Sequence, residues 1–385
     1  MDTDIGPAGR PWHRQMQPRA TAEAYRSATP LELLFDLCFV VAVAQAAGRL
    51  HHAISDHHVG DGVRGYLMVF FAIWWAWMNF TWFASAYDVD DVPYRLATGV
   101  EIAGVLVLAA GVPRAFDSAS SADADFGVVT AGYVIMRLAL VGQWLRAAHA
   151  HPAGRRTALR FAAGVTACQL GWIGLLFVPD PWRLRLFPVL VVAELAVPVW
   201  AERAGRTAWH PGHIAERYGL FTLIVLGETV LSATTAIQVA VDAGGATVEL
   251  LTIAASGLVI VFSMWWLYFD RPVHHLLVSN RVAFVWGYGH YFVFASAAAV
   301  GAGLAVAVDG ADVPGAVSVP VAVYLLVVWA LHIRPHRRAR TAKAVAFPVA
   351  AALVLATLVT SQPLPLTALV IAALVAFCVV EAARA

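Results

Sequence analysis

The sequence has few charged residues, and this shortage limits the classes of protein that it can encode. Asp, Glu, Lys and Arg make up 13% of its 385 residues, whereas soluble domains carry about 25%. Hydrophobic residues make up 60%, and the mean hydropathy is +0.69. A soluble protein of this size would lack polar surface, so we expect lipid to surround much of the chain. The net charge of +1 gives no reason to expect a nucleic-acid partner.

Cysteines and catalytic motifs are also scarce. Cys38, Cys168 and Cys378 lie far apart in apolar segments, which predicts neither a disulfide framework nor a metal-binding spacing. We find no nucleophile elbow, phosphate-binding loop, dinucleotide fingerprint or zinc-protease helix, so no cofactor is expected and no motif favours an enzyme. Residues 1–29 have no apolar core. We therefore expect no signal peptide, and the first membrane helix must direct insertion.

Long apolar runs are what the sequence does contain. A membrane-spanning helix needs about 20 mostly apolar residues. The sequence predicts an all-α, polytopic bundle of about twelve transmembrane helices, over residues 31–50, 65–86, 95–113, 127–148, 158–178, 184–201, 217–240, 247–269, 282–307, 316–333, 343–361 and 364–383.

The distribution of basic residues predicts the orientation. We expect a cytoplasmic polar arm over residues 1–29, an N-terminal six-helix half over 30–201 and a C-terminal six-helix half over 202–385. This orientation places 20 of the 26 Arg and Lys residues on the cytoplasmic side, in agreement with the positive-inside rule. An even number of helices brings both termini to the cytoplasm.

The two predicted halves share a weak signature. Asp36 precedes the tryptophan-rich segment at Trp74 by 38 residues, and Glu228 precedes a second such segment at Trp265 by 37. The pattern is compatible with two six-helix repeats. Parallel repeats of this kind bracket a binding site near the membrane midplane in transporters.

Ionisable residues within the predicted spans are candidates for a substrate or ion pathway, because charge in hydrocarbon is costly and must face protein or water. They are Asp36, Glu228, Glu194, Arg137, Glu101 and Glu32. For Glu32 we favour a structural role, since Thr29 and Pro30 predict a helix start and Glu32 would complete a capping box. Asp36 has no such explanation, and we favour a functional role.

The remaining four candidates have different surroundings. Small polar residues follow Glu228, and we favour a functional role for it. Glu194 lies between two prolines that bend helices and can open cavities, so a functional and a structural role both remain open. Glu101 and Arg137 could form a buried ion pair between neighbouring helices, which we interpret as structural.

Several polar clusters lie at the predicted membrane surfaces. A possible cation or charge cluster comprises Asp88, Asp90, Asp91, Arg95, Glu216 and Arg217, and we favour charge pairing over a bound divalent cation. Residues 51–58 contain four histidines, which we interpret as a polar external loop rather than a zinc or copper site. In residues 209–217, Pro211 and Gly212 are expected to break any helix, which disfavours a metal site. For Trp74, Trp75 and Trp77 we favour packing over a ligand pocket.

Several segments resemble the bacterial low-temperature-requirement A family. They are residues 29–45, 79–96, 104–116, 132–148, 193–203 and 209–231, and the similarity extends in register over roughly residues 29–290. The resemblance implies a multi-pass inner-membrane protein associated with growth at low temperature, but no defined activity. Glu101 departs from the amide expected in relatives. The segments typical of the family contain Asp36, Asp88, Asp90, Asp91, Arg95, Arg137, Glu194, Glu216, Arg217 and Glu228.

Two functions from different classes are compatible with these features. The leading hypothesis is proton- or ion-coupled transport of a small or amphiphilic solute, in which Asp36 and Glu228 exchange a proton or bind a cation. The alternative is a membrane-embedded enzyme or binding protein for a lipid or other hydrophobic ligand. A purely structural role in the membrane is the third reading. Membrane lipids are expected partners in each case.

Overall fold

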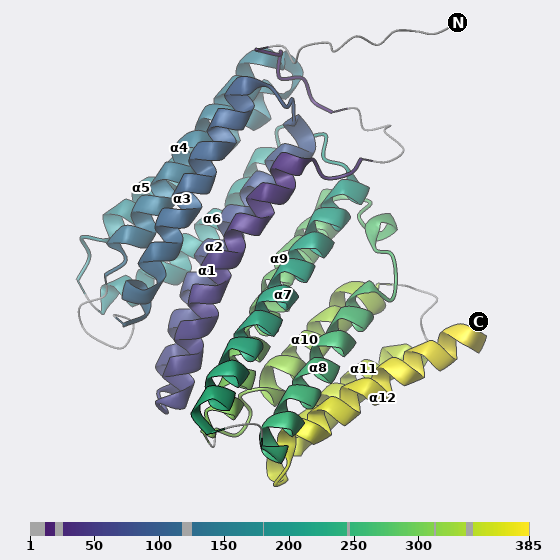
Figure 1. Cartoon of the computed structure of the whole chain (residues 1–385). Coiled ribbons are helices and arrows are strands. Elements are labelled where there is room, and N and C mark those ends of the chain that lie inside the picture. Colours follow the sequence, from purple (N-terminus) through teal and green to yellow (C-terminus); the bar gives the residue numbers. More distant parts are fainter. Residues whose placement is uncertain are drawn as a thin grey trace, which may run out of the picture. The chain divides into compact units, whose positions relative to one another are not determined.

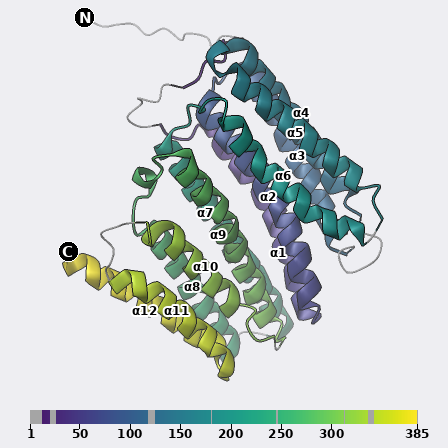
Figure 2. The same ribbon diagram turned by 180° about the vertical axis from the view of Figure 1, so that it is seen from behind.

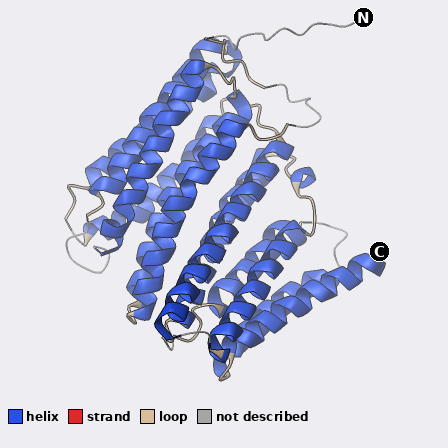
Figure 3. Ribbon diagram, viewed as in Figure 1, coloured by secondary structure: helices blue, strands red, loops and turns tan. Residues whose placement is uncertain are grey.

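The computed structural model describes residues 12–19, 26–117, 125–179, 181–244, 247–311, 313–335 and 342–384. Within these ranges the chain forms helices, turns and loops but no strands (Figure 3). Parts of the predicted N-terminal arm, residues 1–11 and 20–25, lie outside the described residues. The all-α prediction is confirmed.

The described residues contain twelve α-helices. In chain order they are α1 (Pro30–Ser55), α2 (Val59–Tyr87), α3 (Val92–Asp117), α4 (Gly127–Ala150), α5 (Arg155–Leu175), α6 (Trp182–Glu202), α7 (Pro211–Gly244), α8 (Val248–Phe269), α9 (Asn280–Val308), α10 (Ser318–Val328), α11 (Ala342–Ala356) and α12 (Pro363–Arg384).

Each helix lies at the position of one predicted span, and α1, α2, α3 and α7 extend several residues beyond theirs. In the described part of the chain, 11 helical segments are long and apolar enough to cross a membrane. The shorter α10 continues into a π-helical turn, Trp329–Ile333. The chain is therefore a multi-pass membrane protein.

Local sequence signals set several helix starts. Pro30, Pro211 and Pro363 are each the first residue of a helix, a position that needs no backbone N–H donor. The Thr247 side chain accepts a hydrogen bond from the backbone N–H of Leu250 and so caps α8. These signals explain why the helices begin within apolar stretches at defined residues.

Two local predictions were wrong. The expectation that Pro211 and Gly212 break any helix fails, because Pro211 begins α7 and does not interrupt it. The expected histidine loop over residues 51–58 also fails in part, because α1 continues to Ser55 and contains His51 and His52.

The chain divides into two compact units that interleave in sequence. Unit 1 comprises residues 1–38, 76–111 and 126–214, and unit 2 comprises residues 39–75, 112–125 and 215–385. Within unit 1, α5 packs against both α4 and α6 (Figure 1). Within unit 2, α12 packs along α8 and α11, and α10 lies between α9 and α11 (Figure 2).

The backbones of α3 and α4 approach closely in unit 1. A Cβ atom added to Gly132 of α4 would lie 2.4 Å from the backbone nitrogen of Leu108 on α3. Small residues allow such contacts between membrane helices, where van der Waals packing rather than the hydrophobic effect drives association. Gly132 is therefore required by packing.

We expect Gly132→Leu to lower the free energy of unfolding in detergent by about 1–3 kcal/mol, because the new side chain must separate the two helices. Gly142→Leu is the matched control on α4, since a Cβ atom at Gly142 meets nothing within 4 Å. Thermal unfolding of both variants measures the difference. Equal stability of the two variants would contradict the close approach.

Candidate functional site

The predicted capping box at the start of α1 is present. The backbone N–H of Thr29 donates to Glu32 Oε2 at 2.8 Å, and the backbone N–H of Glu32 donates to Thr29 Oγ1 at 3.3 Å. The carboxylate also lies at the positive end of the helix dipole, which stabilises negative charge. This confirms the interpretation of Thr29 as the N-cap.

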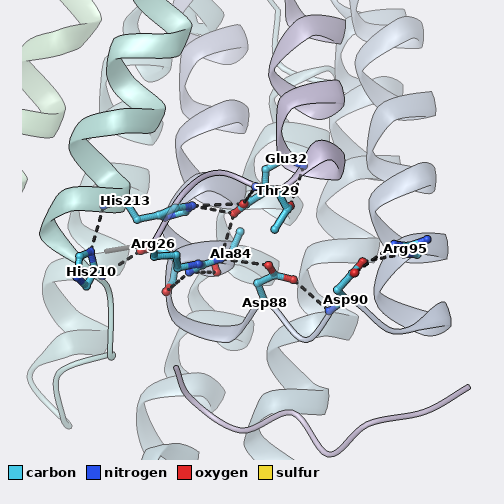
Figure 4. A network of polar contacts seen from close by, with 10 residues as sticks. Arg26, Thr29, Glu32, Ala84, Asp88, Asp90, Arg95, His210 and His213 are labelled. Carbon is cyan, nitrogen blue, oxygen red and sulfur yellow. Dashed lines mark hydrogen bonds and ion pairs between the residues drawn. The ribbon is translucent and has the colours of Figure 1, made fainter. Parts of the chain in front are cut away.

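Glu32 also belongs to a buried charge network in unit 1 (Figure 4). Its Oε1 atom lies 3.4 Å from Arg26 Nη2 and 3.1 Å from His213 Nε2. All three side chains are buried. The sequence pattern did not identify Arg26 or His213 as a partner of Glu32, because neither lies in an apolar run. Glu32 thus joins the start of α1 to the residues before it and to the first turn of α7.

Arg26 also contacts the carboxyl end of α2. Its Nη1 atom donates to the backbone oxygens of Ala84 and Ser85 at 3.1 and 2.7 Å, and its Nη2 atom donates to Asp88 at 3.2 Å. A basic side chain suits the unpaired carbonyl groups at a helix C-terminus. That preference is the one signal in the sequence that could have identified Arg26.

Asp88 lies between α2 and α3 and titrates abnormally. Burial raises the pKa of its carboxyl from 3.8 to about 6, and the nearby Glu32 carboxylate acts in the same direction. Arg26 opposes both effects by favouring the charged form. The network therefore contains one carboxyl that changes charge near pH 6.

Ion pairs engage the other acidic residues of the surface cluster. Arg95 Nε lies 2.7 Å from Asp90 Oδ1, and Arg146 Nη1 donates to Asp91 Oδ1 at 3.0 Å. Burial of Asp91 acts to raise its pKa, but the bonds from Arg146 and from the Arg14 backbone N–H outweigh it, so the pKa is lowered. These contacts support charge pairing. Among the described residues, no group of three or more His, Cys, Asp or Glu side chains could hold a metal ion.

The last two members of the predicted cluster lie in unit 2. Glu216 and Arg217 are in the second turn of α7, and Arg217 is completely buried. Their predicted participation in one cluster with Asp88 stays a prediction.

Asp36 accepts a hydrogen bond from a tryptophan. The indole Nε1–H of Trp77 on α2 donates to Asp36 Oδ1 at 2.6 Å, and both side chains are fully buried. The contact explains the position of Trp77, which packs within unit 1. Asp36 belongs to unit 1 and Glu228 to unit 2, so their joint role in a pathway stays a prediction.

Arg137 and Glu194 form another buried ion pair in unit 1. Arg137 Nη2 on α4 lies 3.2 Å from Glu194 Oε1 and 3.3 Å from Glu194 Oε2 on α6. The same guanidinium donates to the Tyr133 hydroxyl at 2.6 Å, and Trp172 on α5 donates to Glu194 Oε1 at 3.1 Å. Three helices therefore meet at one charge pair. Glu194 lies on a continuous helix even though Pro188 and Pro198 are inside it.

The predicted ion pair between Glu101 and Arg137 is wrong. Glu101 accepts a hydrogen bond from Gln143 Nε2 on α4 at 3.4 Å, whereas Arg137 binds Glu194. Gln143 lies six residues after Arg137, on another face of the same helix. The sequence showed two opposite charges on neighbouring helices but not which helix face each of them occupies.

Glu228 differs from every other buried carboxylate discussed above. It is only 1% exposed, and its Oε1 atom accepts a hydrogen bond from Ser232 one turn later on α7. Its Oε2 atom accepts no hydrogen bond from any residue that the structure describes. Within the same ranges, no basic side chain forms an ion pair with Glu228.

Glu228 lines a cavity of about 540 Å³ in unit 2, a volume typical of small-molecule sites. Three helix faces surround this cavity, which we call the Glu228 cavity. α7 contributes Glu228, Leu231, Ser232, Thr235, Ala236, Val239, Ala240 and Ala243; α1 contributes Ala44, Ala47, Gly48 and His51; α9 contributes Ala302, Ala305 and Val308, followed by Asp309. These residues recur every three or four positions, so they share one face of each helix. Small side chains on all three faces leave the space unfilled.

The two ends of the Glu228 cavity are chemically distinct. Beside Glu228, α7 and α9 touch: the Thr229 hydroxyl donates to the backbone oxygen of Ala297 at 2.9 Å. At the other end, His51 Nε2 lies 2.6 Å from Asp309 Oδ2, and Ser55 donates to the same oxygen at 3.2 Å. A buried carboxylate therefore lies at one end, and at the other end a more exposed contact between His51 and Asp309 joins α1 to the end of α9.

Within the described residues, twelve α-helices, most of them long and apolar enough to cross a membrane, define a multi-pass helical membrane protein. The chain belongs to the bacterial low temperature requirement A protein (LtrA) family, whose model matches residues 27–380. This confirms the family that the motifs indicated.

One relative is uncharacterized protein RA0937 of Rhizobium meliloti (strain 1021). It is 30% identical over 282 residues, which cover 67% of this chain and 64% of that protein. The match therefore covers less than two thirds of the relative's length.

We expect Arg137→Met or Glu194→Met alone to lower the free energy of unfolding by about 3–5 kcal/mol, because each leaves a buried charge without its partner. The double variant should recover most of the loss, since neither charge remains. Detergent unfolding curves of the four proteins measure this coupling. Additive losses in the double variant would show that the ion pair is not the relevant interaction.

For Asp88 we expect a pH-dependent contribution to stability. The folded form holds its proton up to about pH 6 whereas the unfolded carboxyl releases it near 3.8. The contribution of Asp88 to the free energy of unfolding is therefore greatest below pH 4. It decreases by about 3 kcal/mol as the pH rises through 6. Asp88→Asn should remove this decrease.

Thermal unfolding in detergent at pH 4, 5, 6 and 7 provides the measurement. The wild type should lose stability relative to Asp88→Asn across this range. Asp90→Asn is the control, because the surface pair with Arg95 is removed while Asp88 is retained. Parallel pH profiles for the wild type and Asp88→Asn would refute the assignment.

Proposed function

We propose that this protein couples movement of a small or amphiphilic solute across the membrane to proton or cation exchange at Glu228. The observation that carries the proposal is a buried carboxylate that faces a cavity and has no basic partner among the described residues. The Glu228 cavity supplies space for a solute directly beside the ionisable group.

The energetics of Glu228 support exchange. An isolated charge in a protein interior or a membrane costs several kcal/mol, so an unpaired carboxylate is either protonated or accompanied by a mobile cation. Alternation between these two conditions is the elementary step of ion coupling. Arg137 holds Glu194 as a permanent ion pair, and such a pair suits a fixed structural connection better than exchange.

The other candidate residues take supporting places in this proposal. Asp36 is a second exchange site, with Trp77 as its hydrogen-bond donor. The helices of unit 1 are held in register by four buried residues, Glu32, Glu101, Glu194 and Arg137. We also propose an inner-membrane location with both termini in the cytoplasm, on the asymmetry of Arg and Lys along the chain.

Proton movement into proteoliposomes tests the proposal. Vesicles with a trapped pH dye would contain wild type, Glu228→Gln, Asp36→Asn or Glu249→Gln, and amino acids, sugars and organic cations would be added outside. We expect solute-dependent proton movement in the wild type and its loss in Glu228→Gln, because the amide can neither bind nor release a proton. Glu249→Gln is the matched control, since Glu249 is exposed in the first turn of α8.

Loss of proton movement in Glu228→Gln with retention in Glu249→Gln would support the proposal. An Asp36→Asn variant as active as the wild type would remove Asp36 from the pathway. If wild-type protein moves no protons with any solute, and all variants unfold at the wild-type temperature, the transport proposal is wrong.

A further inference from the structure

We infer that the Glu228 cavity binds a single-chain amphiphilic organic cation, with an ammonium group at Glu228 and an alkyl chain along the small-residue faces of α1, α7 and α9. The inference deepens the proposed function by naming the class of solute, and it rests on the same cavity. The charge, the polarity and the shape of the Glu228 cavity each support the inference independently.

The charge of the Glu228 cavity favours a cation. No Arg or Lys is among the residues that line it. Of its two carboxylates, Asp309 already contacts His51 and Ser55, whereas Glu228 Oε2 accepts no hydrogen bond from the described residues. An ammonium group would supply both the missing donor and the missing positive charge, in the stronger, charge-assisted form of hydrogen bond. One available carboxylate matches one positive charge.

The polarity of the walls favours an alkyl chain over a sugar or an amino acid. Between its two charged ends, the cavity is lined mainly by Ala, Gly, Leu and Val, and its remaining polar side chains are Ser232 and Thr235. Several hydroxyl groups on a ligand would lose their water here without equivalent partners, which is unfavourable. Methylene groups have no hydrogen bonds with water to lose, and their transfer from water to the apolar walls is favourable.

The shape of the cavity is elongated. Its residues on α7 run from Glu228 to Ala243, and 15 residues of helix rise about 22 Å. An extended chain of ten carbons fits within this length. α7 and α9 touch at Thr229, beside Glu228, so we place the head group at that end of the cavity and the chain toward His51.

A series of three probes with the same chain tests the inference on detergent-purified full-length protein. We would titrate decylammonium, decanol and decanoate into the wild type and follow binding by calorimetry. Decylammonium should bind on the order of tenfold to a hundredfold more tightly than decanol, because one charged hydrogen bond distinguishes them. Decanoate should bind most weakly, since it repels Glu228. Among shorter alkylammonium ions, affinity should rise about fourfold per methylene.

Variants distinguish binding of the probe in the Glu228 cavity from its uptake into the detergent micelle. Glu228→Gln removes the charge, and Ala236→Phe fills the cavity without altering the carboxylate; each should weaken decylammonium binding about tenfold or more. Thr234→Phe is the matched control, because Thr234 is exposed on α7 and does not line the cavity. It should bind like the wild type. Melting temperatures verify that each variant folds.

Equal affinity for the three head groups would overturn the inference without the use of any variant. Binding that is unchanged in both Glu228→Gln and Ala236→Phe would also overturn it, because the probe would then be in the micelle only. Decylammonium binding without proton movement would leave this inference intact and refute transport. Proton movement with another solute, without decylammonium binding, would support transport and refute the inference.

Discussion

A carboxylate within a membrane-spanning bundle must have a partner, and this requirement organises the structure. Glu194 meets Arg137, Glu32 meets Arg26 and His213, and Asp36 meets the indole of Trp77. Each of these contacts joins residues from different segments of the chain. The cost of burying charge therefore determines which helix faces meet in unit 1 as much as hydrophobic packing does.

Glu228 shows the same requirement with a different solution. Its hydrogen-bond partner is a serine hydroxyl on its own helix, and it adjoins a cavity whose described lining residues include no arginine. Where protein supplies the counter-charge, the result is a fixed connection between helices. Where a cavity adjoins the carboxylate, the counter-charge must come from a proton or a ligand. That difference separates the proposed exchange site from the structural charge pairs.

The sequence predicted the fold well and the polar contacts unevenly. The apolar runs predicted every α-helix to within a few residues over most of the chain, and Thr29, Pro30 and Glu32 identified the capping box. The contacts of Arg26 and His213 with Glu32 were not predicted, because both residues lie outside the apolar runs, where a polar side chain is expected to meet water. Arg137 was assigned the wrong carboxylate because hydropathy does not say which face of α4 meets α3 and which face meets α6. The start of α7 was missed because proline was interpreted as a helix breaker.

The sequence by itself determined that this is a helical membrane protein, where its helices run, and that a few carboxylates lie within them. These properties depend on short segments, since a helix satisfies its own backbone hydrogen bonds and needs only local hydrophobicity to enter lipid. Only the tertiary structure decided which carboxylate has an arginine and which faces a cavity. The Glu228 cavity exists because small residues on three helix faces, far apart in sequence, converge and leave space that no side chain fills.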